Sequence, residues 1–121
     1  MRRFYITLSL FITCLSAGWI FSQEGETKEM TLHDFMEDHV ELAEKKFKKG
    51  NKEPMKRILQ TIPSLALPED KEKWEQITSE ALESGKYLSS CKSCHVKFKK
   101  SYKKSYKKRL VSIPKEILNL K

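Results

Sequence analysis

Two cysteines three positions apart, with a histidine directly after the second, could carry redox or metal chemistry in this 121-residue chain. The residues are Cys91, Cys94 and His95, and Cys-x-x-Cys-His is the attachment signature of a c-type haem. Cysteines three apart on a helix lie about one turn apart on nearly the same face, so both thiols can reach one porphyrin edge. The motif therefore predicts one covalent haem c, with thioether bonds from Cys91 and Cys94 and with His95 as the proximal iron ligand.

Three other chemistries use cysteines at this spacing, and each fits the sequence less well. A zinc site would need a fourth ligand such as His33 or His39, and three ligands from one helical turn cannot easily surround a tetrahedral ion. A thioredoxin-like pair is expected in a βαβ setting, which the sequence does not indicate. A disulfide between Cys91 and Cys94 would close a very small loop, with little entropic benefit.

The sixth iron position, opposite His95, decides what such a haem does. Met36 is the first candidate, because it lies on the apolar stripe of a predicted helix and a thioether ligand raises the reduction potential. A stripe methionine can also simply pack the core. His39 borders the same stripe and is the rival ligand, His33 lies nearer the polar side, and the remaining alternative is an open, five-coordinate iron.

The first half of the chain predicts two helices joined by a short link. Thr31 and Asp34 match a capping-box-like helix start, and Gly50 is a plausible stop after the last periodic residue. Asn51 can cap a second helix, whose first turn tolerates Pro54 because those amides lack partners anyway.

From Pro68 to about Tyr106 the apolar spacing is again helical, with a gap at Ser84-Gly85. We expect a tight turn there, because one unbroken helix would be long for so small a domain. No strand pattern is visible. The prediction is an all-α fold, a small antiparallel four-helix bundle around the haem. The alternative is a bundle of three helices, of which the C-terminal one is long.

The segment CKSCHVKFKKSY, residues 91–102, resembles the C-terminal helix of cytochrome c′ and related helical-bundle c-type cytochromes. In that family the haem motif lies on the last helix and a basic residue follows it, as Lys97 and Lys99 do here. The segment LHDFMEDHV, residues 32–40, is similar to the helix that supplies the distal side of such haems. The resemblance implies a haem-centred bundle and a homodimer, although this chain is shorter before Cys91.

Charge is concentrated at the C-terminal end of the chain. Residues 23–95 hold 12 basic and 15 acidic residues, a net charge of −3, whereas residues 96–121 hold 10 basic residues and one acidic residue, a net charge of +9. Such a surface suits acidic redox partner proteins and, as an alternative, anionic lipid headgroups. Interleaved Tyr and Lys also occur in nucleic-acid-binding proteins, but an exported chain seldom meets nucleic acid. A solvated helix end is the plain structural explanation.

The first 22 residues have the order of an export signal, with a basic start and an apolar run before a polar segment. An uncleaved membrane anchor and a lipid-modified Cys14 are the alternatives. The predicted organisation is a signal peptide at 1–22, a haem-binding helical domain at 23–110 and a tail at 111–121, in a periplasmic protein.

The sequence therefore indicates a single-electron carrier. It contains no paired-carboxylate site, no nucleophile with an adjacent base and no phosphate-binding loop, so we do not expect an enzyme. The alternative is a five-coordinate haem protein that binds nitric oxide or carbon monoxide.

Overall fold

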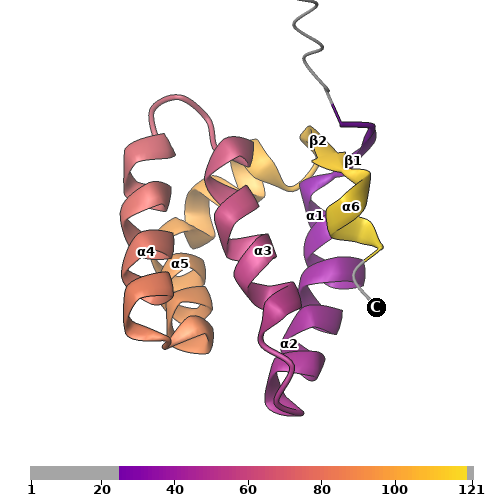
Figure 1. Cartoon of the computed structure of the whole chain (residues 1–121). Coiled ribbons are helices and arrows are strands. Elements are labelled where there is room, and N and C mark those ends of the chain that lie inside the picture. The colour runs from indigo at the N-terminus through magenta and orange to yellow at the C-terminus, as the bar shows by residue number, and fades with distance from the viewer. Residues whose placement is uncertain (1–24, 120–121) are drawn as a thin grey trace, which may run out of the picture.

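A computed structural model describes residues 25–119, most of which are helical. Figure 1 shows the arrangement, with α4 beside α5 on one side of α3, and with α1, α2 and the two strands on the other side. The elements in chain order are β1 (Thr27–Thr31), α1 (Leu32–Asp34), η1 (Phe35–Val40), α2 (Glu41–Lys48), α3 (Glu53–Thr61), η2 (Ile62–Leu65), α4 (Lys71–Ser84), α5 (Tyr87–Ser101), η3 (Tyr102–Tyr106), β2 (Leu110–Pro114) and α6 (Lys115–Leu118). The prediction of a mostly helical protein is confirmed.

The first helical segment runs without a break through α1, η1 and α2. It begins as expected at Thr31, whose Oγ1 accepts a hydrogen bond from the backbone N–H of Asp34 at 3.1 Å. η1 is a π turn, in which the Glu41 N–H reaches the carbonyl of Met36, five residues earlier. Just beyond α2, Gly50 has a φ of 95°, a conformation that glycine adopts without strain.

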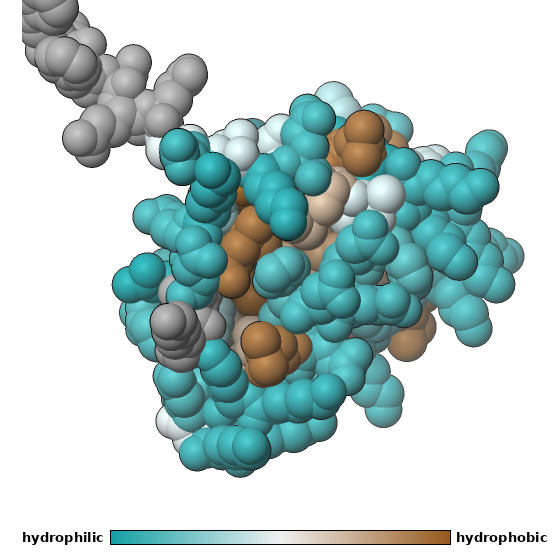
Figure 2. All heavy atoms as spheres, turned by 90° about the vertical axis from the view of Figure 1, so that its right-hand side faces the viewer, coloured by the Kyte–Doolittle hydropathy of each residue, from teal (hydrophilic) through white to brown (hydrophobic). Residues whose placement is uncertain are grey.

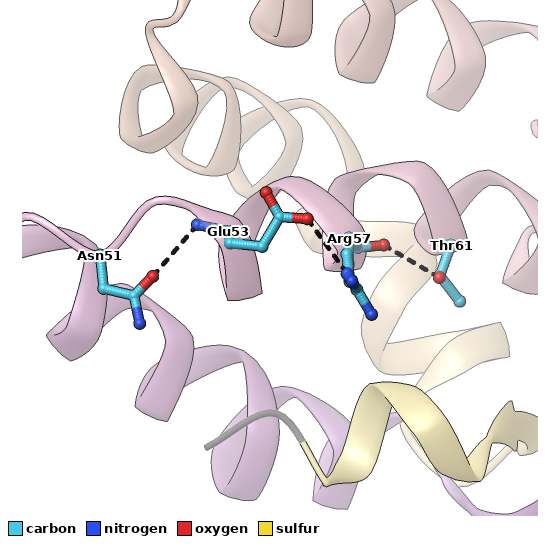
Figure 3. Close-up of polar contacts among 4 residues, drawn as sticks. All are labelled: Asn51, Glu53, Arg57 and Thr61. Carbon is cyan, nitrogen blue, oxygen red and sulfur yellow. Dashed lines mark hydrogen bonds and ion pairs between the residues drawn. The ribbon is translucent and has the colours of Figure 1, made fainter.

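α3 has a polar face held by a chain of short-range hydrogen bonds (Figure 3). The N-cap residue is Lys52 rather than the predicted Asn51, but the Asn51 side chain still accepts a hydrogen bond from the N–H of Glu53 at 3.4 Å. The Glu53 carboxylate then accepts from the Arg57 guanidinium at 3.1 Å, and the Thr61 hydroxyl donates to the Arg57 carbonyl at 3.0 Å. The opposite face of the helix is buried and consists of Pro54, Met55, Ile58 and Leu59.

α4 and α5 are separate helices joined by a tight turn. α4 ends at Ser84, Gly85 takes a φ of 72°, and its N–H donates to the carbonyl of Ala81 at 2.9 Å. α5 begins two residues later, at Tyr87. The predicted turn at Ser84-Gly85 is therefore confirmed, and the alternative of one long C-terminal helix is wrong.

A two-stranded antiparallel sheet joins the beginning of the described chain to its end, where sequence analysis expected helices alone. β1 pairs with β2 in a register that places Thr27 opposite Pro114 and Thr31 opposite Leu110. Val111 and Ile113 of β2 are buried, and Leu110 and Ser112 are exposed, which is the alternation of a half-buried strand. The all-α prediction is wrong for these ten residues, because each strand is too short and too dependent on a distant partner to show in a local pattern.

One hydrophobic core connects the helices to the sheet. Its largest fully buried side chains are Tyr106, Phe35, Leu32, Met55, Ile58 and Ile113. The 111–119 part of the expected tail thus contributes to the core through β2 and α6, since Val111, Ile113 and Ile117 are all buried. Figure 2 shows the face over α6 and the strands as mostly hydrophilic, with apolar side chains reaching the surface in separate small spots.

No helix within residues 25–119 is long and apolar enough to cross a membrane. The predicted signal peptide at 1–22, with Cys14, lies outside the described residues.

Candidate functional site

Cys91, Cys94 and His95 lie together in the middle of α5, as the motif predicted for a helix. Both cysteines are half-buried and free, and the Cys91 thiol donates to the Tyr87 carbonyl one turn earlier at 3.6 Å. His95 is exposed. The two thiols and the imidazole are therefore available to a group that binds against this face of the helix.

A cavity of about 540 Å³ opens beside the motif. It is bounded by the first helical segment, by α4, by the second half of α5 and by η3. Its lining residues are Leu32, His33, Met36, Trp74, Cys94, His95, Val96, Phe98, Lys99, Tyr102, Lys103, Tyr106 and Lys107. The lining is largely apolar and aromatic, and the volume falls within the range of small-molecule and cofactor sites, about 300–1,000 Å³.

A second cavity of about 80 Å³ shares part of this wall. Met36, Trp74, Cys94 and His95 line both cavities, and Cys91 lines the smaller one. The structure thus brings the four residues predicted for haem attachment and ligation to one region between the first helical segment and α5. Met36 reaches it from η1, and the motif reaches it from α5.

The two histidines considered as rival iron ligands lie in different places. His33 lines the larger cavity, where its Nδ1 lies 3.1 Å from the Tyr102 hydroxyl and its Nε2 lies 3.3 Å from the Glu37 carboxylate. His39 lines neither of these cavities. It stacks on Phe35 with ring centroids 6.1 Å apart and borders a separate small pocket against α3 and α6.

The π turn explains why Met36 and His39 line different cavities, although the predicted helix has Met36 on its apolar stripe and His39 at the border of that stripe. Residues three apart in an α-helix differ by about 60° around the axis, which leaves them on neighbouring parts of one face. A π turn takes more residues per turn, so the same two residues are further apart around the axis. Met36 consequently contributes to the cavities beside the motif, and His39 does not. Such turns are frequent at functional sites.

The thiols are poor candidates for a reactive thiolate pair. Burial raises the pKa of Cys91, and burial together with the neighbouring Cys91 raises the pKa of Cys94 to about 11, against a smaller opposing effect of Lys97. A redox-active or readily metal-binding cysteine usually has a lowered pKa. No group of three or more His, Cys, Asp or Glu side chains within residues 25–119 is placed to hold a metal ion.

Aromatic side chains form the wall behind the motif. The Trp74 ring packs against Tyr106, with centroids 4.9 Å apart, and against Phe98 at 5.8 Å. The Trp74 indole N–H is buried and has no hydrogen-bond partner among the described residues. Because a buried donor without a partner costs free energy, this atom suits a group that brings an acceptor of its own.

Tyr106 fixes the end of this wall. Its hydroxyl donates to the Asp70 carboxylate at 2.7 Å and accepts a hydrogen bond from the Leu67 N–H at 3.0 Å. Arg109 adds a hydrogen bond to the Leu65 carbonyl at 2.7 Å. Tyr106 was predicted as the approximate end of the last helical pattern. Its contacts with the loop before α4 were not predicted, because the sequence offers no local signal for them.

Comparison of the chain with protein-family models, with curated proteins and with solved structures finds no match. The similarity of residues 91–102 to the cytochrome c′ helix therefore stays a prediction.

Proposed function

We propose that this protein is an exported monohaem c-type cytochrome that carries single electrons. The observation that supports the proposal best is the shared lining of the two cavities by Cys94, His95 and Met36. These residues come from two helical segments far apart in the sequence. A chain selected only for packing has no need to leave an apolar cavity at the one place where a haem-attachment motif lies.

The residues beside the cavities divide into attachment, ligation and packing roles. Cys91 and Cys94 would hold the porphyrin through thioether bonds, and His95 would be the proximal iron ligand. Met36 would be the distal ligand, because it lines the same cavities from the facing segment. When bound, haem supplies a one-electron redox centre, and a thioether ligand raises its potential.

A second candidate function follows from the surroundings of Met36. Leu32 lines the larger cavity with Met36 and is fully buried, and Met36 itself packs against the core. If Met36 only packs, the distal side is apolar and the iron is five-coordinate. The protein would then bind nitric oxide or carbon monoxide, as the resemblance to cytochrome c′ implies.

The basic surface after the motif supports docking of an acidic redox partner. Residues 96–121 carry a net charge of +9, and most lysines of α5 and η3 are exposed. Such docking should weaken steeply with salt, because opposite charges steer the encounter. Anionic lipid contact and a homodimer are the other associations that we expect for this surface and family. We propose no nucleic-acid partner, and the periplasm is the proposed location.

The test of the main proposal is an absorption spectrum of natively matured protein together with haem staining after denaturing electrophoresis. We expect a low-spin spectrum with the ferric Met–iron charge-transfer band, and a haem stain that survives denaturation. Met36→Leu, which keeps the packing, should abolish the charge-transfer band, whereas His39→Gln should leave it unchanged. A high-spin wild-type spectrum with fast carbon monoxide binding supports the gas-binding alternative.

One result would remove both candidates. If mature protein is colourless and both Cys91 and Cys94 react with alkylating reagents, no porphyrin is attached to this chain.

A further inference from the structure

After the motif, a triplet of an aromatic residue followed by two lysines occurs three times, at intervals of four residues. The triplets are Phe98-Lys99-Lys100, Tyr102-Lys103-Lys104 and Tyr106-Lys107-Lys108. In every triplet the aromatic residue and the first lysine line the 540 Å³ cavity, and the second lysine does not. The repeat thus places one row of lysines along the cavity and a second row away from it.

The π turn η3 keeps this row in line. Four residues of an α-helix turn through about 400°, so a repeat of four drifts by about 40° at each step. Between Tyr102 and Tyr106 the helix is wider, and the Lys107 N–H donates to the Tyr102 carbonyl, five residues earlier, at 2.9 Å. The wider turn offsets the drift, because it takes more residues to complete. Lys107 therefore still lines the same cavity as Lys99.

The charges of this row are not neutralised within the described protein. Lys99, Lys103 and Lys107 make no ion pair with any residue from 25 to 119, and no Asp or Glu lines the cavity. The wall also holds Trp74, whose buried indole N–H lacks a partner in the same range. An apolar cavity with a row of cations and one spare donor suits an apolar ligand that carries carboxylates.

We propose that Lys103 and Lys107, with Lys99 and the Trp74 indole, form the binding site for the carboxylates of the cavity's ligand. Under the proposed function, on which this inference rests, these are the two haem propionates. Cys91 and Cys94 would hold the porphyrin at its vinyl groups, and the propionates of a haem lie at the opposite edge of the ring. Lys103 lies nine residues after Cys94, about 14 Å further along the helix. The row therefore sets which end of the cavity receives the propionates.

The repeat offers a matched control for each lysine. Lys103→Gln and Lys104→Gln remove the same charge from neighbouring positions, but only Lys103 lines the cavity. Lys107→Gln and Lys108→Gln form a second pair. The readout is the reduction potential of natively matured, haem-stained protein, measured by spectroelectrochemistry. A cation beside the propionates favours the reduced haem, which has one positive charge fewer, so its loss lowers the potential.

We expect Lys103→Gln and Lys107→Gln to lower the potential more than their controls do, and the double variant to lower it furthest. High salt should reduce the change in reduction potential more for the control variants than for the lining variants. The reason is that salt screens a lysine paired with a propionate less than it screens an exposed lysine. Trp74→Phe keeps the ring packing but removes the indole N–H. It should therefore also lower the reduction potential. Equal shifts for the lining and control lysines would overturn this inference while leaving the proposed function intact. Mature protein without haem would overturn the proposed function itself.

Discussion

Replacing Tyr106 with phenylalanine removes one hydroxyl from the centre of the molecule and leaves the aromatic ring in place. The ring is fully buried and keeps its contact with Trp74. The hydroxyl is lost together with its hydrogen bonds to the Asp70 carboxylate, 2.7 Å, and from the Leu67 N–H, 3.0 Å. The substitution therefore tests how strongly the end of η3 is held to the loop before α4.

The expected cost follows from the two bonds. A hydrogen bond to a charged group contributes about 1.5–3 kcal/mol and a neutral one about 1 kcal/mol. Asp70 is only half-buried and can regain water, so the lower end applies to it, whereas the Leu67 N–H loses its partner. We expect Tyr106→Phe to lower the free energy of unfolding by about 2–3 kcal/mol.

Tyr102→Phe is the matched control, because Tyr102 occupies the same place in the preceding triplet. Its hydroxyl has one partner, His33, at 3.1 Å, in a half-buried setting, so the expected loss is about 1 kcal/mol. The assay is urea denaturation of matured protein followed by circular dichroism, with the slope of the transition unchanged. Equal losses in the two variants would refute the reasoning.

Alkaline pH gives the same prediction a second readout. Burial raises the pKa of Tyr106 to about 12, whereas an unfolded tyrosine titrates near 10. The Tyr106 hydroxyl makes its full contribution to the free energy of unfolding below pH 10. This contribution is lost as pH rises towards 12, because the hydroxyl loses its proton at a lower pH in the unfolded state than in the folded state. The phenylalanine variant lacks this titration. The stability difference between the wild type and Tyr106→Phe should therefore narrow from pH 10 to 12, and a constant difference would contradict the assignment.

Three further substitutions test how the framework is held, each by the same denaturation assay. Thr31→Ala removes the cap on the Asp34 N–H and should cost about 1 kcal/mol, whereas Thr31→Ser should cost little; equal effects would rule out the capping role. Gly85→Ala places a side chain at a φ of 72° and should cost about 1 kcal/mol, so an unchanged midpoint would mean that the α4–α5 turn adopts another conformation. Ile113→Ala should cost about 2–4 kcal/mol because the side chain is fully buried, and the exposed Ser112→Ala less than about 0.5 kcal/mol; similar values for both would show that β2 does not pack on the core.

Features that depend on a few neighbouring residues could be predicted from the sequence. The cap at Thr31, the glycine at 85 and the placement of Cys91 and Cys94 on one helix each follow from local chemistry. The sheet could not, because its two strands are five residues long and lie more than 70 residues apart in the chain. Its register depends on a pairing that neither segment shows alone.

The cavity was predictable only in part. The motif and Met36 indicated a shared site from their residue types, and the structure places them beside common cavities. The π turns were not predictable, because the spacing of apolar residues was compared with an α-helix of 3.6 residues per turn throughout. They decide that His39 lies away from the motif and that Lys107 lies beside the same cavity as Lys99.

The pairing of β1 with β2 sets an order of events during biogenesis. Chains emerge N-terminus first, so Leu110–Pro114 becomes available only after Cys91, Cys94 and His95. Until β2 arrives, β1 lacks its strand partner, and β1 leads directly through Thr31 into the helix that carries Met36. The segment that carries Met36 therefore receives its strand contact only after the Cys-x-x-Cys-His motif has been made. Closing the sheet then joins the first and last strands of the described chain.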